Sequence, residues 1–149
     1  MTPEKIIKLN GQDVKMIYCT ATENGFEDMS NRPIQVFFPT FGKDAQGNDI
    51  IVEPAQAKTA DFITLALAAI VAAYTKDDAE PPINAKYILY DATPQERNDL
   101  LTAITELRTK WYNVNDVAGN LIREDAAAAE AAANKGKGGQ RRNAKPKNA

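Results

Sequence analysis

The fold of this chain is decided by one apolar stretch near its middle, Thr59-Ala60-Asp61-Phe62-Ile63-Thr64-Leu65-Ala66-Leu67-Ala68-Ala69-Ile70-Val71-Ala72-Ala73-Tyr74. Thr59 is expected to begin a helix, because Asp61 then lies in the first turn, where an acid favours the positive end of the helix dipole. The most apolar part, residues 60–74, is shorter than the roughly 20 residues that span a bilayer, and much of it is alanine. We therefore predict a buried helix and no membrane span.

This predicted helix has little polar face, and a helix that is apolar nearly all round must be covered on several sides. A body of this size can hardly surround it with its own chain, so the pattern favours self-association into a homo-oligomer or burial against a partner. The interleaved alanines would let a second helix approach closely. The candidate partner-binding residues on this helix are Phe62, Leu65, Leu67, Ile70, Val71 and Tyr74.

The N-terminal part predicts a β-hairpin followed by a short helix. Asn10-Gly11 separates two apolar runs, residues 6–9 and 14–18, and both turn residues tolerate the positive φ angles that a tight hairpin needs. In residues 20–29, Thr20 and Glu23 have the spacing of a capping box, which favours a helix beginning at Thr20.

Residues 34–53 predict two extended pieces, 35–38 and 50–53, on either side of a polar turn at residues 43–49. Pro39 ends the first piece or confines it to a sheet edge. The aromatic group Phe37, Phe38 and Phe41 belongs either to the core, which we favour, or to a binding surface. The turn lacks the spacing and closing glutamate of a calcium loop, so we expect it to be a solvated turn.

The last well-defined element is a helix that begins after residue 93. Thr93 is the predicted N-cap, Pro94 occupies the first helical position, and Glu96 completes a capping box. An apolar stripe with helical spacing follows, and it predicts a core-facing side: Leu100, Leu101, Ile104, Leu107 and Trp111. Trp111 and Tyr112, at the end of this helix, are further candidates for contact with a partner.

These elements predict an α+β fold, with a small N-terminal β-hairpin or sheet and a mainly helical core. We place the folded domain at residues 1–116 and an alanine-rich helical extension at 117–134. A basic tail at 135–149 follows, and its lack of large apolar residues predicts disorder.

Charge divides the chain in the same way. The formal net charge is −2, but residues 135–149 hold six of the 18 basic residues and none of the 20 acidic ones, so they carry +6 and the remainder −8. The tail could contact a polyanion, the acidic body of a neighbouring subunit, or nothing; polyanion binding would be weak and sensitive to salt. Its basic residues are Lys135, Lys137, Arg141, Arg142, Lys145 and Lys147.

The composition argues against an enzyme. The chain has no histidine, which removes the commonest general base and metal ligand, and one cysteine, Cys19, which leaves no redox pair or cysteine-rich zinc site. No phosphate-binding glycine motif occurs, and we expect neither cofactor nor metal. Cys19 is interpreted as a small buried hydrophobe, and the lack of a signal peptide's apolar core predicts a cytoplasmic protein.

Five segments carry a resemblance to a known family, and they follow one another in its order. They are Ile7-Lys8-Leu9-Asn10-Gly11-Gln12-Asp13-Val14-Lys15-Met16-Ile17-Tyr18, Phe26-Glu27-Asp28-Met29-Ser30-Asn31-Arg32-Pro33-Ile34, Thr59-Ala60-Asp61-Phe62-Ile63-Thr64-Leu65-Ala66-Leu67-Ala68-Ala69-Ile70, Tyr87-Ile88-Leu89-Tyr90-Asp91-Ala92-Thr93-Pro94 and Glu106-Leu107-Arg108-Thr109-Lys110-Trp111-Tyr112. In residues 5–115 the chain resembles the small tail assembly chaperones of long-tailed phages and prophages, especially those of Bacteroides-type hosts. These are packing motifs and not catalytic ones.

The resemblance implies an assembly factor in the cytoplasm of a bacterial host. Such chaperones coat the tape measure protein and help the tail tube to assemble around it, so the implied partners are the tape measure protein and the tail tube protein. Two alternatives remain open, a nucleic-acid-binding accessory protein acting through the basic tail and a structural subunit of the virion tail. Nucleic acid is the less favoured partner, and no membrane contact is expected.

Overall fold

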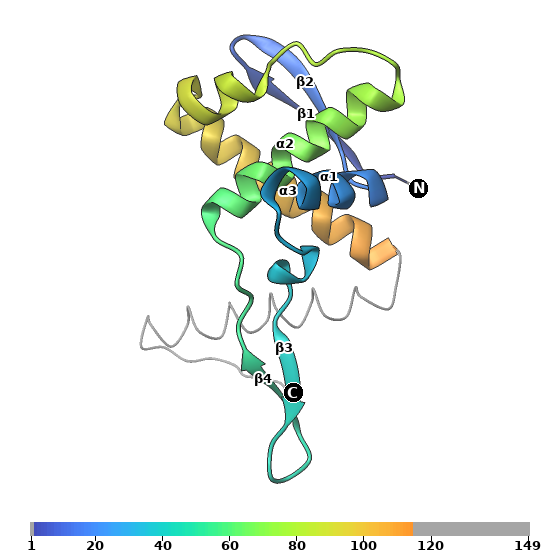
Figure 1. Ribbon diagram of the computed structural model, residues 1–149, viewed down its shortest axis with the longest axis vertical. Helices are drawn as coiled ribbons and strands as arrows, with labels where there is room; N and C mark the ends of the chain where they lie inside the picture. The colour runs from blue at the N-terminus through green and yellow to red at the C-terminus, as the bar shows by residue number, and fades with distance from the viewer. Residues whose placement is uncertain (1, 115–149) are drawn as a thin grey trace.

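The computed structural model describes residues 2–114, which form an α+β fold as predicted (Figure 1). The chain first forms a hairpin of β1 (Glu4–Leu9) and β2 (Gln12–Ile17) and then helix α1 (Thr20–Ser30). A 3₁₀ turn, η1 (Ile34–Phe37), leads into a second hairpin of β3 (Thr40–Lys43) and β4 (Asp49–Glu53). Helices α2 (Thr59–Lys76), η2 (Tyr87–Asp91) and α3 (Pro94–Val114) complete the described part. The predicted extension at 117–134 and the basic tail at 135–149 lie outside it.

The β1–β2 hairpin confirms the prediction from Asn10-Gly11. The strands are antiparallel, with Leu9 opposite Gln12, and the two turn residues have φ angles of 53° and 75°. Alternation along the strands turns Leu9 and Val14 into the core, where neither is exposed, while Ile6 on the outer face is 60% exposed.

Helix α1 begins at Thr20 as expected, but its cap differs from the prediction. Cys19, not Thr20, is the N-cap, and the reciprocal partner is Thr22 instead of Glu23. The Thr22 hydroxyl accepts the Cys19 backbone N–H at 3.2 Å and donates to the Ile17 carbonyl at 2.9 Å. This frees the Glu23 carboxylate to bind tyrosine hydroxyls.

The prediction of an extended piece at residues 35–38 is wrong, because η1 occupies this position. The 3₁₀ turn directs Phe37 into the core, where its ring packs edge-on at 4.9 Å from both the Phe26 and the Phe62 ring centroids. Tertiary packing of this one ring overrides the extended preference of the local sequence. Of the aromatic group, Phe37 is buried as predicted, whereas Phe38 and Phe41 are half-buried.

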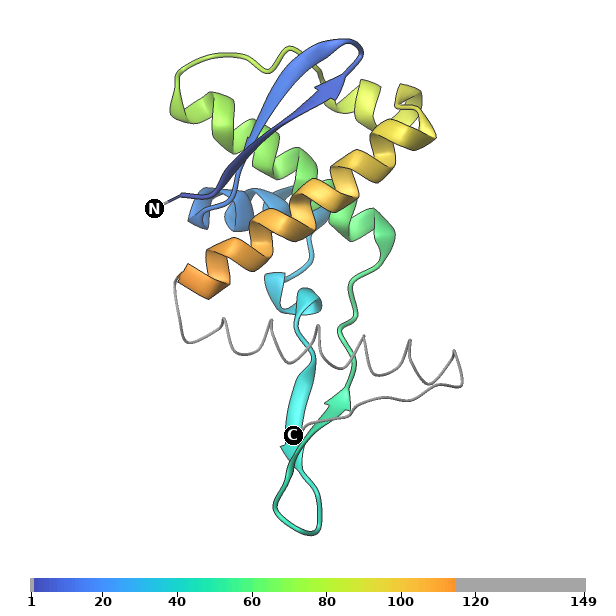
Figure 2. The ribbon, with the colours of Figure 1, turned by 180° about the vertical axis from the view of Figure 1, so that it is seen from behind.

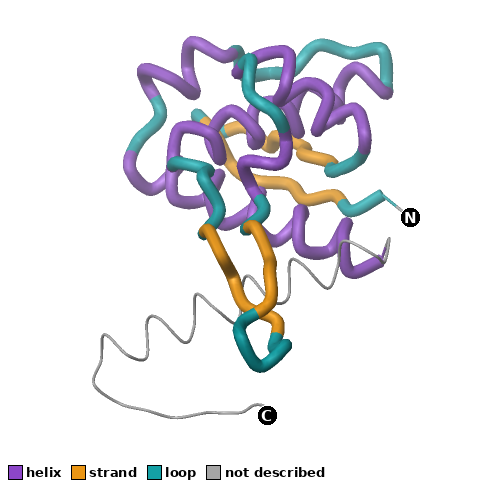
Figure 3. The backbone as a smooth tube through the Cα atoms, turned by 60° about the horizontal axis from the view of Figure 1, so that its bottom comes forward, coloured by secondary structure: helices purple, strands orange, loops and turns teal. Residues whose placement is uncertain are grey.

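The β3–β4 hairpin, called the arm below (residues 40–53), projects from the body of the fold (Figures 1 and 3). Its β4 strand confirms the predicted extended piece at 50–53, while β3 was not predicted. The polar turn between the strands is closed by Asp44, whose carboxylate accepts the backbone N–H groups of Gln46 at 2.9 Å and Asn48 at 2.8 Å.

Helix α2 passes through the centre of the fold and is covered by α1, β2 and α3 (Figures 1 and 2). The chain thus covers much of this helix by itself, although Val71 stays exposed. The α1–α2 contact is close because Gly25 faces Ala68: a Cβ atom added to Gly25 would lie 3.3 Å from the Ala68 Cβ. By length and composition α2 could span a membrane, and 56% of it is buried within the protein.

Helix α3 confirms the predicted capping box. The Thr93 N–H donates to Glu96 Oε1 at 2.9 Å, and the Glu96 N–H donates to Thr93 Oγ1 at 3.1 Å. Its predicted stripe faces the core, where three of its residues are fully buried: Leu100, Ile104 and Leu107. An ion pair between Lys5 and Glu106 holds α3 beside β1.

Candidate functional site

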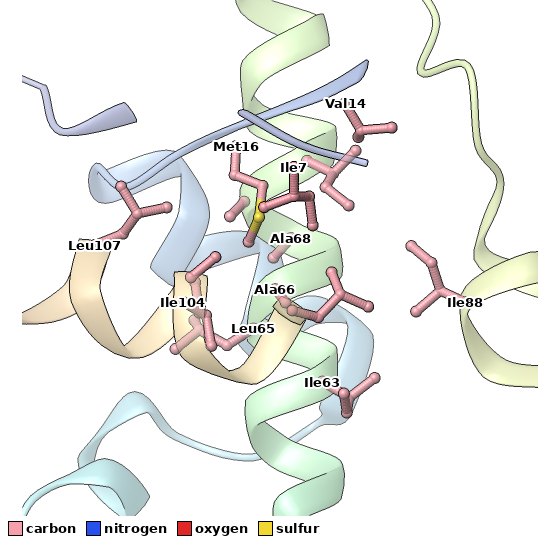
Figure 4. Packing of buried hydrophobic residues seen from close by; sticks show 14 of the residues in the cluster. Ile7, Val14, Met16, Ile63, Leu65, Ala66, Ala68, Ile88, Ile104 and Leu107 are labelled. Carbon is pink, nitrogen blue, oxygen red and sulfur yellow. The ribbon is translucent and has the colours of Figure 1, made fainter. Parts of the chain in front are cut away.

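The six candidate residues of α2 divide into buried and accessible positions. Leu65 and Ile70 are fully buried, and Leu65 points toward α3 near Ile104 (Figure 4). The expectation that these two residues contact a partner is therefore corrected, because the chain's own helices already cover them. Phe62, Leu67 and Tyr74 are half-buried, and Val71 is 37% exposed.

Leu67 and Val71 line an apolar groove of about 330 Å³. They lie four residues apart, on one face of α2, and Met29 from the last turn of α1 forms part of the same wall. The segment after α2 supplies the remaining lining: Glu80, Pro81, Ile83, Asn84 and Ala85. The groove is thus an apolar surface with the polar groups of Glu80 and Asn84 on its lining.

The position of the groove follows from how the chain leaves α2. The helix ends at Lys76, and Pro81-Pro82 cannot continue it. Ile83 is 4% exposed and anchors the returning segment to the core. Met29, 44% exposed, remains open to solvent beside Val71. The groove therefore stays accessible although the fold buries most of α2.

Trp111 and Tyr112 do not line the groove. Both are half-buried and pack against Tyr18, with ring centroids 6.3 Å and 6.4 Å away respectively. The Tyr112 hydroxyl donates to the Glu23 carboxylate, which also accepts the Tyr18 hydroxyl at 2.9 Å. Burial, reinforced by Glu23, raises the pKa of both tyrosines. This cluster joins Tyr18, the residue after β2, to α1 and α3, and contact of Trp111 and Tyr112 with a partner stays a prediction.

Arg108 is a buried cation that the sequence analysis did not single out. Its guanidinium lies 4.9 Å from the Phe38 ring centroid and donates to the Phe37 carbonyl at 2.6 Å. The side chain is 6% exposed. Arg108 lies in α3 and Phe37 in η1, 71 positions apart in the sequence. Only the fold brings them together, so no local sequence pattern indicates this contact.

A second buried charge, Asp61, stabilises the start of α2. Its carboxylate accepts the Lys58 N–H at 2.8 Å and pairs with Arg32, whose Nε lies 3.0 Å from Asp61 Oδ1. Asp61 lies in the first turn of α2, as the sequence predicted, and these contacts, which were not predicted, cap that turn and anchor the segment after α1 to it.

Within residues 2–114, no cluster of three cysteine, aspartate or glutamate side chains is placed to bind a metal ion. The six basic residues proposed to contact a polyanion lie outside the described residues: Lys135, Lys137, Arg141, Arg142, Lys145 and Lys147. Comparisons of the chain with models of protein families, with curated proteins and with solved structures gave no match. The groove is therefore interpreted from its own chemistry.

Proposed function

We propose that the protein is a tail assembly chaperone of a long-tailed phage or prophage. In this proposal it binds the tape measure protein and assists assembly of the tail tube in the cytoplasm of the bacterial host. The observation that carries the proposal is the open apolar groove formed by Leu67, Val71 and Met29. The resemblance of residues 5–115 to that family of chaperones supports the same function.

A groove of this kind suits an amphipathic helix. Such a helix presents apolar side chains at positions i, i+3 and i+4, and these anchors insert into an apolar channel. Met29 adapts its flexible side chain to different anchors, while Glu80 and Asn84 offer polar contacts. The tape measure protein is the long helical partner that the family resemblance implies.

Weak individual contacts are an advantage for a chaperone, which must release its partner. The groove holds about 330 Å³, so it accepts only a few side chains and buries little apolar area in one contact. Coverage of a long helix then requires several copies of the chaperone acting side by side. Homo-oligomer formation and contact with the tail tube protein belong to this proposal.

The test is co-expression of the full chain with the tape measure protein, comparing Val71→Glu with the wild type. Val71 is 37% exposed, so a carboxylate there stays hydrated and the fold is retained, but it places a charge in the groove. We expect the amount of tape measure protein recovered with the chaperone to fall by about tenfold or more, equivalent to about 1.4 kcal/mol of binding free energy.

Ile6→Glu is the matched control, because it introduces the same charge at an exposed apolar residue on β1, outside the groove. This variant should recover the tape measure protein as the wild type does, and circular dichroism should show both variants folded. Equal recovery with all three proteins would reject the groove as the binding site. No recovery even with the wild type would reject the chaperone function.

A further inference from the structure

The arm is a two-stranded hairpin that lacks a packing layer among the described residues. Its strands pack chiefly against each other, and it projects from the body (Figure 3). An isolated two-stranded hairpin is marginal in water, and it becomes stable when a third strand or a helix covers an apolar face. Among residues 2–114, no third strand or helix covers the arm in this way.

The apolar face of the arm is defined by Ile50 and Val52. They are 40% and 59% exposed, on a strand whose ends are Asp49 and Glu53. Gly42 lies opposite Ile50, and a Cβ atom added to it would lie only 2.6 Å from Val52 Cγ2. The Val52 side chain therefore packs over the Gly42 backbone, and Ile50 and Val52 together form a small exposed aliphatic face.

The described chain ends beside the base of this arm. Near the end of α3, the Tyr112 ring packs edge-on against the ring of Phe38, with centroids 5.2 Å apart, and Phe38 precedes β3 by two residues. Arg108, one helical turn earlier, donates to the Phe37 carbonyl at 2.6 Å. The residues that follow Val114 therefore start within reach of the arm.

We propose that the alanine-rich segment 117–134 of the same chain docks as a helix on the Ile50–Val52 face of the arm. Val117 and Leu121 are spaced i, i+4, with Ile122 beside them, so a helix would present them on one side. As a helix the 18 residues would extend about 27 Å, which exceeds the roughly 17 Å of a five-residue strand. The small alanine side chains of the segment would let such a helix lie close to Ile50 and Val52.

The experiment is hydrogen exchange followed by mass spectrometry on the full chain, without any partner present. The variant Leu121→Asp/Ile122→Asp removes the apolar contacts of the segment. We expect amides of residues 40–53 to exchange about tenfold faster than in the wild type, while those of β1, β2 and α3 stay unchanged. The control Asn120→Asp/Asn134→Asp adds the same charge at polar positions and should leave the arm protected.

The reciprocal variant, Val52→Asp, should accelerate exchange within residues 117–134, and Gln46→Asp at the arm's turn should not. Arm exchange that is equally fast in the wild type and both segment variants would overturn the proposal. Arm protection that grows with protein concentration would also overturn it, since it would assign the face to a second copy. Because no tape measure protein is used, these outcomes are independent of the chaperone function.

Discussion

Single side chains in this protein close the ends of elements and join distant ones. Glu96 caps α3, accepts the Asn10 backbone N–H at 2.6 Å and accepts the Tyr87 hydroxyl at 2.7 Å. It thereby connects the turn of the first hairpin, η2 and α3 through one carboxylate. Such charge-assisted hydrogen bonds are roughly twice as strong as those between neutral groups.

The Glu96 carboxylate makes the stability of the fold depend on pH. The N–H groups of Thr93 and Asn10 and the Tyr87 hydroxyl lower its pKa to about 2. Because the folded pKa lies below the unfolded value, the contribution is present above about pH 4.3 and is lost as pH falls toward 2. We expect Glu96→Ala to cost about 1–2 kcal/mol at pH 7 and clearly less at pH 2.5. Urea unfolding of the variant and the wild type at both pH values measures this loss of unfolding free energy. An equal loss at pH 7 and pH 2.5 would contradict the prediction.

Arg108 gives a second prediction at the scale of one residue. Its planar guanidinium stacks near Phe38 and binds the Phe37 carbonyl, a combination that a lysine ammonium does not reproduce. We expect Arg108→Lys to lower the free energy of unfolding by about 1.5–3 kcal/mol, the range for a hydrogen bond to a charged group. Chemical denaturation tests this, with the exposed Arg97→Lys as a control that should stay within about 0.5 kcal/mol of the wild type.

At the scale of elements, local signals predicted what local physics determines. Asn10-Gly11 fixed the first hairpin, and Thr93 with Glu96 fixed the start of α3, because these patterns need only neighbouring residues. The turn at Ile34–Phe37 was missed because it depends on where the Phe37 ring packs. The groove was found in part: helical spacing singled out Leu67 and Val71, whereas Met29 and Ile83 come from remote segments that only the fold brings to them.

The contact between α1 and α2 depends on a glycine. Gly25 lies in the middle of α1, where glycine costs about 1 kcal/mol of helix propensity relative to alanine. The close approach of α1 and α2 favours glycine here, because a Cβ atom at this position would lie only 3.3 Å from the Ala68 Cβ. We expect Gly25→Leu to lower the free energy of unfolding by about 1–3 kcal/mol or more through overpacking. Thermal unfolding measures this loss of stability. A variant as stable as the wild type would show that α1 and α2 can move apart without cost.

At the scale of the whole domain, residues 2–114, the main core cluster runs from the first hairpin to α3, and a small second cluster joins Ile17 to Ala72 and Ala73. The main cluster packs against most of α2, while Leu67 and Val71 of the same helix line the open groove. What the sequence could not show was how three segments share the cover of this helix. The homo-oligomer stays a prediction.

A main core that contains residues from both ends of the domain predicts a single unfolding transition. Trp111, the only tryptophan, packs against Tyr18 of the N-terminal part, so its fluorescence reports whether the two ends of the domain are joined. We expect the urea curves from fluorescence and from circular dichroism at 222 nm to coincide, as two-state unfolding requires. Separate midpoints would show that α3 detaches before the other helices unfold.

The contact between Lys5 and Glu106 has a consequence for synthesis of the protein. These residues are 101 positions apart, yet α3 covers the first hairpin. At about 5–20 residues per second, a ribosome needs roughly 5–20 s to extend the chain from one to the other. During that interval the apolar faces of β1, β2 and α2 have no α3 to bury them. The nascent chain is therefore exposed to proteases and to aggregation until α3 has emerged.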